Sequence, residues 1–400
     1  MTTYLNNYKN PLYHTNYTDY YNSVVRVSNS QSYGTGALLY DGRSVLTAAH
    51  VFEGYDTDNI VVYFDTATGT QAYNATIQVY DGYDSTNSNG DLAILTLEEN
   101  PSEFYERYDI YRESIVSGQE FTMVGYGAYG SGSSGEILDA TDILKLKTSN
   151  TFESDFYDIY SAASTNLAWE PLEDAVLAAD FDSAYSVNDA FGNILGLDDL
   201  GLGYEEGMIA AGDSGGPAFV DDKIAGVASY TASISADNVS TDSNYVVDSS
   251  FGEVGAWQSV SYYQEWIDKT IRDGYVNAPT SKEEVQTSVT ETDDGVSYAY
   301  FLLEFLGDRE SIADNITCSY TTRDGTATAG EDYISISGTI TLYSDESAVA
   351  LAVEIIGDTN IEGDETFYMD VTDPSYGSFA DDALTISAVR TIVDDDFMVG

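Results

Sequence analysis

Short apolar stretches alternate with turn-forming residues along the first 150 residues. The stretches are rich in β-branched and aromatic side chains, and Gly, Asn, Asp and Ser separate them. Runs of this kind predict strands, and their regular succession indicates an all-β barrel or sandwich. The predicted strands are residues 24–27, 37–40, 60–64, 75–80, 92–97, 121–125 and 143–146.

The pattern changes between residues 150 and 207, where Asp, Ala, Ser and Leu follow no clear period. We expect long loops there, with a single helical turn. The clearest helix spans residues 256–273, because its apolar side chains recur at helical spacing and Gly274 follows its end. Those apolar residues are Val260, Tyr263, Trp266, Ile267 and Ile271.

A second β domain is predicted at residues 284–400, after a linker at 275–283. Its six apolar stretches suggest a two-sheet sandwich. They are residues 298–305, 316–320, 340–343, 348–356, 367–371 and 384–393. Residues 1–21 are left as an N-terminal extension or possible propeptide.

The charge is extreme, with 68 Asp and Glu against 14 Lys and Arg and a formal net charge of −54. Because 43% of the residues are hydrophobic and 13% aromatic, this is not a disordered acidic tail. Nucleic-acid binding needs clustered cations, which are missing, and an anionic membrane surface is disfavoured for the same reason. High salt or bound Ca²⁺ would make such a surface tolerable.

The single cysteine, Cys318, excludes an intrachain disulfide. The first ten residues have neither the basic nor the apolar region of a signal peptide, and we expect no membrane insertion because no long apolar run occurs. An export signal of another kind, a signal already removed, and a cytosolic protein all remain open.

Residues 212–217 read Gly-Asp-Ser-Gly-Gly-Pro. Glycine permits a sharp turn that exposes the hydroxyl of Ser214. The same turn can aim the amides of Gly212 and Ser214 at one point, where they would hold an oxyanion. The plain alternative is a glycine-rich turn without chemistry.

A serine nucleophile needs a base, and the chain has only two histidines. His14 lies in a polar segment, whereas His50 closes an apolar strand, so His50 is the candidate base. Asp91 leads directly into another apolar strand and is the candidate carboxylate that orients the imidazole. A core histidine and a turn-capping aspartate are the plain alternatives.

The segments LTAAH, GDLAIL and GDSGGP, in this order, resemble the trypsin/chymotrypsin family of serine endopeptidases over residues 22–274. The resemblance implies a chymotrypsin-like double β-barrel with a C-terminal helix and a site between the barrels. Ser214 would be the nucleophile, His50 the base and then the acid, and Asp91 the orienting acid. The amides of Gly212 and Ser214 would form the oxyanion hole.

The same resemblance implies a substrate cleft for proteins or peptides. Ser229, Tyr230 and Thr231 would line it, with Ser229 supporting Asp91. Met208, followed by Ile209, would lie at the base of the primary pocket. No carboxylate is present there to pair with Lys or Arg, and Thr231 would narrow the mouth of the pocket. These positions predict a preference for apolar side chains of modest size rather than for Lys or Arg.

Two acidic features fall outside this catalytic set. Asp213 pairs with a new N-terminus in many relatives, but no matching N-terminal motif occurs here, so another partner or an oxyanion hole formed without cleavage is expected. For Asp180, Asp182 and Asp189 we considered a metal site and favour a solvated acidic loop.

Carboxylates also gather at strand ends in the second domain, in the segments 321–333, 355–367 and 391–396. Converging carboxylates repel one another unless a cation intervenes, and Ca²⁺ accepts such clusters. These segments resemble the Calx-beta domain, an immunoglobulin-like Ca²⁺-binding sandwich, over about residues 284–397. The resemblance implies one or two ions and these candidate ligands: Glu291, Asp332, Asp358, Glu362, Glu365, Asp394, Asp395 and Asp396.

The sequence therefore predicts a monomeric, calcium-supported serine endopeptidase, extracellular or on a cell surface in a saline environment. Two alternatives remain. One is an adhesion or binding protein that uses the barrel domain as an inactive scaffold, and the other is a cytosolic regulatory protease.

Overall fold

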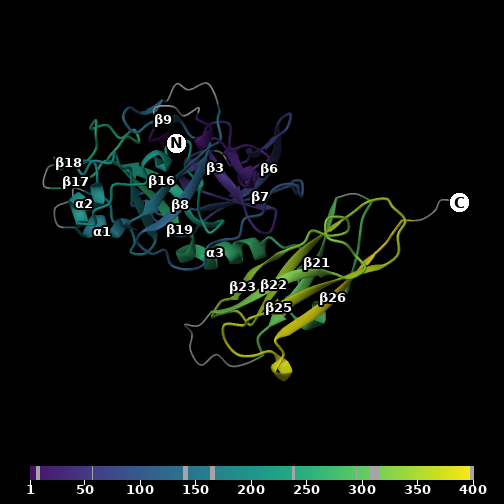
Figure 1. Ribbon diagram of the computed structural model, residues 1–400. Coiled ribbons are helices and arrows are strands. Elements are labelled where there is room, and N and C mark those ends of the chain that lie inside the picture. Colours follow the sequence, from purple (N-terminus) through teal and green to yellow (C-terminus); the bar gives the residue numbers. More distant parts are fainter. Residues whose placement is uncertain are drawn as a thin grey trace. The chain divides into compact units, whose positions relative to one another are not determined.

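The computed structural model describes residues 1–5, 10–55, 57–137, 143–162, 167–236, 239–293, 295–306 and 315–396. The chain forms two compact units, Met1–Thr270 and Ile271–Gly400, and Figure 1 labels many of their elements. The first unit includes residues 1–21, which the sequence left as an extension. Their first strand, β1 (Thr2–Thr3), lies between β9 (Tyr129–Ser131) and β14 (Gly207–Met208).

The first half of this unit is a closed barrel in the order β2-β3-β4-β7-β6-β5. Alternating apolar side chains fill it because successive residues of a strand face opposite sides. Val25, Leu38, Phe64 and Leu95 are among the residues buried in its core. The strands are β2 (Val24–Ser28), β3 (Tyr33–Leu38), β4 (Ser44–Thr47), β5 (Ile60–Thr66), β6 (Gly69–Val79) and β7 (Ala93–Leu97).

The second half is a seven-stranded sheet in the order β11-β8-β15-β16-β19-β13-β12. Phe121 and Phe152 stack with ring centroids 3.9 Å apart beside the buried Trp257. The strands are β8 (Gln119–Gly125), β11 (Leu146–Phe152), β12 (Ser154–Asp155), β13 (Val176–Asp180), β15 (Pro217–Val220), β16 (Lys223–Ala232) and β19 (Val254–Ser259). Together the two halves give the expected chymotrypsin-like all-β architecture.

The expectation of long loops between residues 150 and 207 is wrong. This stretch contains β12, β13 and the helices α1 (Phe156–Ser161) and α2 (Ala190–Leu195). Every residue of β13 is buried, so the strand shows none of the polar alternation that marks a half-exposed strand. The expected solvated loop is wrong too, because Asp180, Asp182 and Asp189 are each at most 1% exposed.

Two element boundaries also differ. Helix α3 (Val260–Asp273) begins four residues later than predicted, because residues 256–259 belong to β19, which pairs with β13 and β16. The strand predicted at 143–146 is wrong: β11 begins only at Leu146, and Ile143 is an exposed apolar side chain.

The second unit is the predicted two-sheet sandwich. One sheet has the order β20-β26-β25-β22-β23 and the other pairs β21 with β24. Tyr333 and Phe367 stack at 4.5 Å in the core between them. The strands are β20 (Ser288–Thr290), β21 (Val296–Glu304), β22 (Ile316–Asp324), β23 (Ser337–Leu342), β24 (Ala348–Ile356), β25 (Glu365–Thr372) and β26 (Thr385–Val393).

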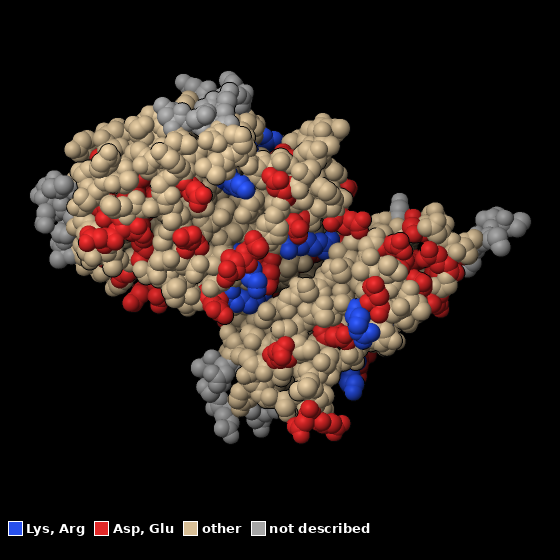
Figure 2. All heavy atoms as spheres, viewed as in Figure 1, with Lys and Arg blue, Asp and Glu red and all other residues tan. Residues whose placement is uncertain are grey.

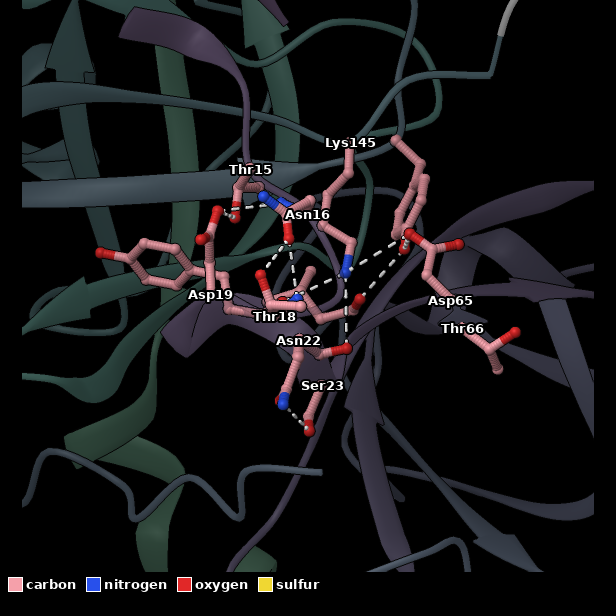
Figure 3. A network of polar contacts seen from close by, with 12 residues as sticks. Thr15, Asn16, Thr18, Asp19, Asn22, Ser23, Asp65, Thr66 and Lys145 are labelled. Carbon is pink, nitrogen blue, oxygen red and sulfur yellow. Dashed lines mark hydrogen bonds and ion pairs between the residues drawn. The ribbon is translucent and has the colours of Figure 1, made fainter. Parts of the chain in front are cut away.

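A buried lysine joins the two halves of the first unit (Figure 3). The Nζ of Lys145, just before β11, donates to the main-chain oxygens of Tyr21 and Asn22 at 3.2 and 3.4 Å. It also lies 3.6 Å from Oδ2 of Asp65 in β5. Burial lowers the pKa of Lys145 to about 8, although Asp65 opposes that shift. Polar contacts of this kind link the two halves of a unit whose sequence contains no cysteine.

The surface is strongly acidic, as expected for a chain with 68 Asp and Glu and only 14 Lys and Arg. Figure 2 shows Asp and Glu scattered over the visible face of both units, with only a few Lys and Arg among them. No helix within the described residues is long and apolar enough to cross a membrane.

Candidate active site

The candidate base and orienting acid lie at the same end of the first barrel. His50 follows β4 in a short 3₁₀ helix (Ala49–Phe52), and Asp91 precedes β7, the neighbour of β4. The main-chain amide of His50 donates to Oδ1 of Asp91 at 2.8 Å. Nδ1 of the His50 ring lies 2.6 Å from Oδ2 of Asp91. These two contacts fix the orientation of the imidazole ring.

The candidate nucleophile comes from the other half of the unit. Ser214 lies in the turn between β14 and β15, and its Oγ is 2.8 Å from Nε2 of His50. The structure thus brings His50, Asp91 and Ser214 into one continuous hydrogen-bonded chain. This geometry lets the imidazole take the serine proton while the carboxylate holds its other nitrogen.

Asp91 is 2% exposed and receives a further hydrogen bond. The hydroxyl of Ser229 donates to its Oδ2 at 2.5 Å, as the sequence predicted. Ser229 lies at a register shift between β16 and β19, which aims its side chain at Asp91. Burial lowers the pKa of His50, but the hydrogen bond and charge of Asp91 outweigh burial and leave that pKa raised.

The predicted oxyanion hole depends on two peptide groups. The carbonyl of Ala211 accepts from Ala128 N at 2.7 Å, and the carbonyl of Asp213 accepts from Gly216 N at 2.7 Å. Because a trans peptide points its N–H away from its carbonyl, the amides of Gly212 and Ser214 face the opposite side. Gly212 has a φ of +93°, which only glycine adopts without strain.

Asp213 has the partner that the sequence left open. Its Oδ2 pairs with the N-terminal amine of Met1 at 2.7 Å, and both groups are buried. The amides of Gly127 and Ala210 donate to the same carboxylate at 2.8 and 2.9 Å. This ion pair secures the turn that carries the nucleophile.

A pocket of about 160 Å³ opens beside Ser214. Four of the predicted substrate-binding residues line it: Ile209, Ser229, Tyr230 and Thr231. Met208 does not line it, because it is fully buried in the core of the seven-stranded sheet. The pocket also includes two acids, Glu136 and Asp248, that the sequence reasoning missed. No local motif marks these acids, which come from distant segments.

One further supporting residue was missed. Oε1 of Gln258, in β19, accepts from the amide of Gly90 at 3.0 Å, and its Nε2 donates to Ser88 O at 2.8 Å. Gln258 therefore holds the loop that carries Asp91. In the sequence, the only indication of this role was that Gln258 is a polar residue in an otherwise largely apolar stretch, which forms the fully buried strand β19.

The carboxylates of the second unit gather in two groups. Glu291, Asp394 and Asp396 form one, and Asp332, Glu362 and Glu365 form the other, each with ligand oxygens within 4.8 Å of one another. Burial and the charge of Asp394 raise the pKa of Glu291 to about 7. Asp358 and Asp395 are in neither group, and Asp358 instead accepts from Asn360 N at 2.6 Å.

Comparisons with known proteins agree with both units. Residues 14–165 match the family model described as Trypsin, and residues 283–396 match the model described as Calx-beta domain. The first range contains His50 and Asp91 and ends before Ser214. No curated protein matches the chain. Among solved structures, neuropsin, a serine protease expressed in the limbic system of mouse brain, is similar with a TM-score of 0.44 and 16% identity. That match covers 63% of this chain and 95% of neuropsin.

Proposed function

We propose that this chain, in which a trypsin-like domain precedes a Calx-beta domain, is a serine endopeptidase. The observation that carries the proposal is the hydrogen-bonded chain from Ser214 Oγ through His50 to Asp91, with contacts of 2.8 and 2.6 Å. A serine hydroxyl becomes a useful nucleophile only when such a base can take its proton.

In the first step Oγ of Ser214 attacks the carbonyl carbon of the scissile peptide bond, and Nε2 of His50 takes the hydroxyl proton. Asp91 stabilises the imidazolium that forms and keeps the proton on Nδ1. The amides of Gly212 and Ser214 donate to the carbonyl oxygen as it becomes negative. Losing one such donor typically slows an enzyme about 10²–10³-fold.

The intermediate then collapses. His50 returns the proton to the amine nitrogen as the carbon–nitrogen bond breaks, and the acyl group stays on Ser214. Water then attacks the carbonyl carbon of this ester while Nε2 of His50 takes a proton from the water. As the carbon–Oγ bond breaks, His50 gives this proton to Oγ of Ser214, and the carboxylic acid product leaves. No step requires a metal ion.

The residues that line the pocket beside Ser214 support an inference about the side chain that precedes the cleaved bond. Glu136 and Asp248 line it and would repel Asp or Glu side chains there. We infer a preference for a cationic side chain. We propose this in place of the apolar preference expected from Met208, Ile209 and Thr231. Ile209 and Thr231 line the pocket, but Met208 does not reach it.

Hydrolysis of a quenched peptide library by the full chain tests the peptidase proposal. We expect turnover by the wild type and a loss of about 10⁶-fold in kcat for Ser214→Ala or His50→Ala. The matched control is Ser233→Ala, a serine outside the catalytic chain of contacts. Equal turnover by wild type and Ser214→Ala, or none by a folded wild type, would reject it in favour of an inactive scaffold.

We also propose that the Calx-beta domain binds Ca²⁺ through its two carboxylate groups. Their oxygens suit a hard cation, and Oδ2 of Asp396 is buried without a hydrogen-bond partner among the described residues. Bound Ca²⁺ would neutralise carboxylates that otherwise repel. Calorimetry of the full chain should give calcium heats that Glu291→Gln with Glu365→Gln reduces, and unchanged heats would contradict the assignment.

The remaining parts of the proposal are the setting and the assembly state. A surface this acidic is best tolerated where salt screens it, so we propose an extracellular or cell-surface location in a saline environment. We propose that the protein acts as a monomer on protein or peptide substrates.

A further inference from the structure

Three carboxylates converge inside the first unit, away from His50 and Ser214. Glu153 follows β11, Asp180 ends β13, and Asp182 lies two residues further on. Each offers an oxygen within 4.8 Å of the others, and their exposures are 6%, 0% and 1%. Buried carboxylates this close together need a positive partner, because taking a charge out of water is costly.

Other contacts hold the segments that carry the three acids. Oδ2 of Asp180 accepts from the amides of Ala190 and Phe191 at the start of α2. Oε1 of Glu153 accepts from Asp180 N at 3.5 Å. The main-chain amide of Asp182 donates to Oε1 of Glu206 at 2.6 Å. These contacts fix the backbone that carries the three acids.

One oxygen of each acid is left over. Glu153 Oε2, Asp180 Oδ1 and Asp182 Oδ1 are buried and have no hydrogen-bond partner among the described residues. No ion pair in that part of the chain reaches any of the three. Native proteins rarely leave buried polar atoms unpaired, so three in one place indicate a missing partner.

The missing partner is positively charged. Without it, three buried carboxylates would carry like charges on oxygens within 4.8 Å of one another. Protonation is therefore the competing way to relieve the repulsion. A proton bridges two oxygens at most, whereas a metal ion contacts all three.

We propose that Glu153, Asp180 and Asp182 bind one Ca²⁺ ion in the trypsin-like domain. All three donors are carboxylate oxygens, which suit a hard cation. Ca²⁺ takes about six to eight oxygens at flexible angles, whereas Mg²⁺ demands a nearly regular octahedron and keeps most of its waters. Both oxygens of a carboxylate, neighbouring carbonyls and water can complete the shell.

The position of the site gives it a structural role. An ion there ties the end of β11 to the end of β13 and to the loop before α2. Asn150 of β11 already contacts the end of β13 and also β14, since it donates to Asp180 O at 2.7 Å and to Gly207 O at 3.0 Å. Glu153 also lines a cavity of about 620 Å³. This role is independent of the peptidase proposal.

Equilibrium dialysis of the full chain against Ca²⁺ counts the bound ions. We expect Glu153→Gln with Asp182→Asn to bind one ion fewer per chain than the wild type. Calcium should also raise the Tm of the first unit less in this variant than in the wild type. A folded variant that keeps every ion, or an unchanged calcium shift in Tm, overturns the proposal.

If the variant Glu153→Gln with Asp182→Asn does not fold, a second variant tests the same proposal. Glu291→Gln, Asp396→Asn, Asp332→Asn and Glu365→Gln together disable both groups in the Calx-beta domain and leave the first unit unaltered. We expect this chain to retain one ion, which adding Asp182→Asn removes. No retained ion, with the three carboxyls protonated instead, overturns the proposal even if the Calx-beta domain and the peptidase behave as described.

Discussion

At the scale of single residues, the contacts of Asp91 distinguish it from the other acids among the 68 Asp and Glu residues of the chain. Asp91 accepts from the amide and ring of His50 and from the hydroxyl of Ser229. Gln258 holds the preceding Gly90. These contacts hold a buried carboxylate at a fixed distance from the imidazole.

Replacing Asp91 with Asn should lower kcat about 10⁴-fold, because the amide stabilises the wrong tautomer of His50. The base must be neutral to work, so activity falls as the pH drops through its pKa. Because Asp91 leaves the pKa of His50 raised, the acid limb of kcat/KM should lie above pH 6.5 in the wild type. Asp91→Asn should move this limb to lower pH.

Stopped assays across pH 5–9 would measure both effects. Ser229→Ala is the milder control, since it removes one donor and leaves the carboxylate in place. Two results would contradict the roles assigned to His50 and Asp91. One is a wild-type kcat/KM that falls only at or below pH 6.5, and the other is an Asp91→Asn variant whose kcat/KM falls at the same pH as in the wild type.

The pocket acids predict substrate preference. Peptides with Lys or Arg before the cleaved bond should react faster than those with Asp or Glu, and Asp248→Asn should narrow that difference by about tenfold. Relative kcat/KM values for otherwise identical peptides measure this. Fastest cleavage after a neutral side chain, unaffected by Asp248→Asn, would restore the apolar preference predicted from the sequence.

The sequence predicted His50, Asp91 and Ser214 because each lies in a compact local motif. It placed Met208 at the base of the pocket, where the structure instead buries that side chain in the core. Glu136 and Asp248 could not be found, since tertiary folding alone brings them to the pocket. Which acids are buried depends on distant neighbours that a single sequence does not reveal.

At the scale of elements, the proposed catalytic residues lie in the segments that connect strands rather than in the strands themselves. Strand β5 of the first barrel was predictable because its buried apolar positions alternate with half-exposed ones. Strand β13 was not, because both its faces are buried and its residues are small. The start of α3 was misplaced because β19 is as apolar as the helix that follows it.

The turn that holds Ser214 depends on Asp213, which accepts from two amides and pairs with the Met1 amine. Asp213→Asn keeps the shape but removes the charge of this buried pair. We expect kcat/KM to fall about 10²-fold, because the oxyanion amides lose their fixed positions.

Parallel measurement of Tm separates this effect from unfolding. Asp109→Asn, which alters a partly exposed ion pair with Arg112, is the control and should leave kcat/KM unchanged. Wild-type kcat/KM in Asp213→Asn would show that the ion pair does not support the turn.

At the scale of the whole molecule, the net charge of −54 has separable components. Most acids lie on the surface, as in Figure 2. A smaller number are buried or clustered and have proposed roles. They are Asp91 and Asp213 at the proposed catalytic site, and the carboxylate groups in both units that we propose bind Ca²⁺. The residues of both groups in the Calx-beta domain were among the ligands predicted from the sequence, together with Asp358 and Asp395, which lie in neither group. Glu153 was not predicted, because its neighbours Asp180 and Asp182 lie in the stretch that was expected to be loops.

Self-repulsion among the surface acids should make stability depend on salt. Raising NaCl from 0.01 to 1 M shortens the screening length from about 30 to about 3 Å, so the Tm should rise. Calorimetry in excess chelator measures this without contributions from Ca²⁺. Choline chloride is the control and should act equally, and a Tm that falls or stays constant would contradict the role assigned to the charge.

The most direct test of the central claim is covalent labelling of the full chain by a serine-reactive peptidyl phosphonate, with the modified residue located by mass spectrometry. We predict one label per chain, on Ser214, and none in Ser214→Ala or His50→Ala. A folded wild type that takes up no label, or a label that remains in Ser214→Ala, would contradict the assignment of this site as a serine peptidase centre.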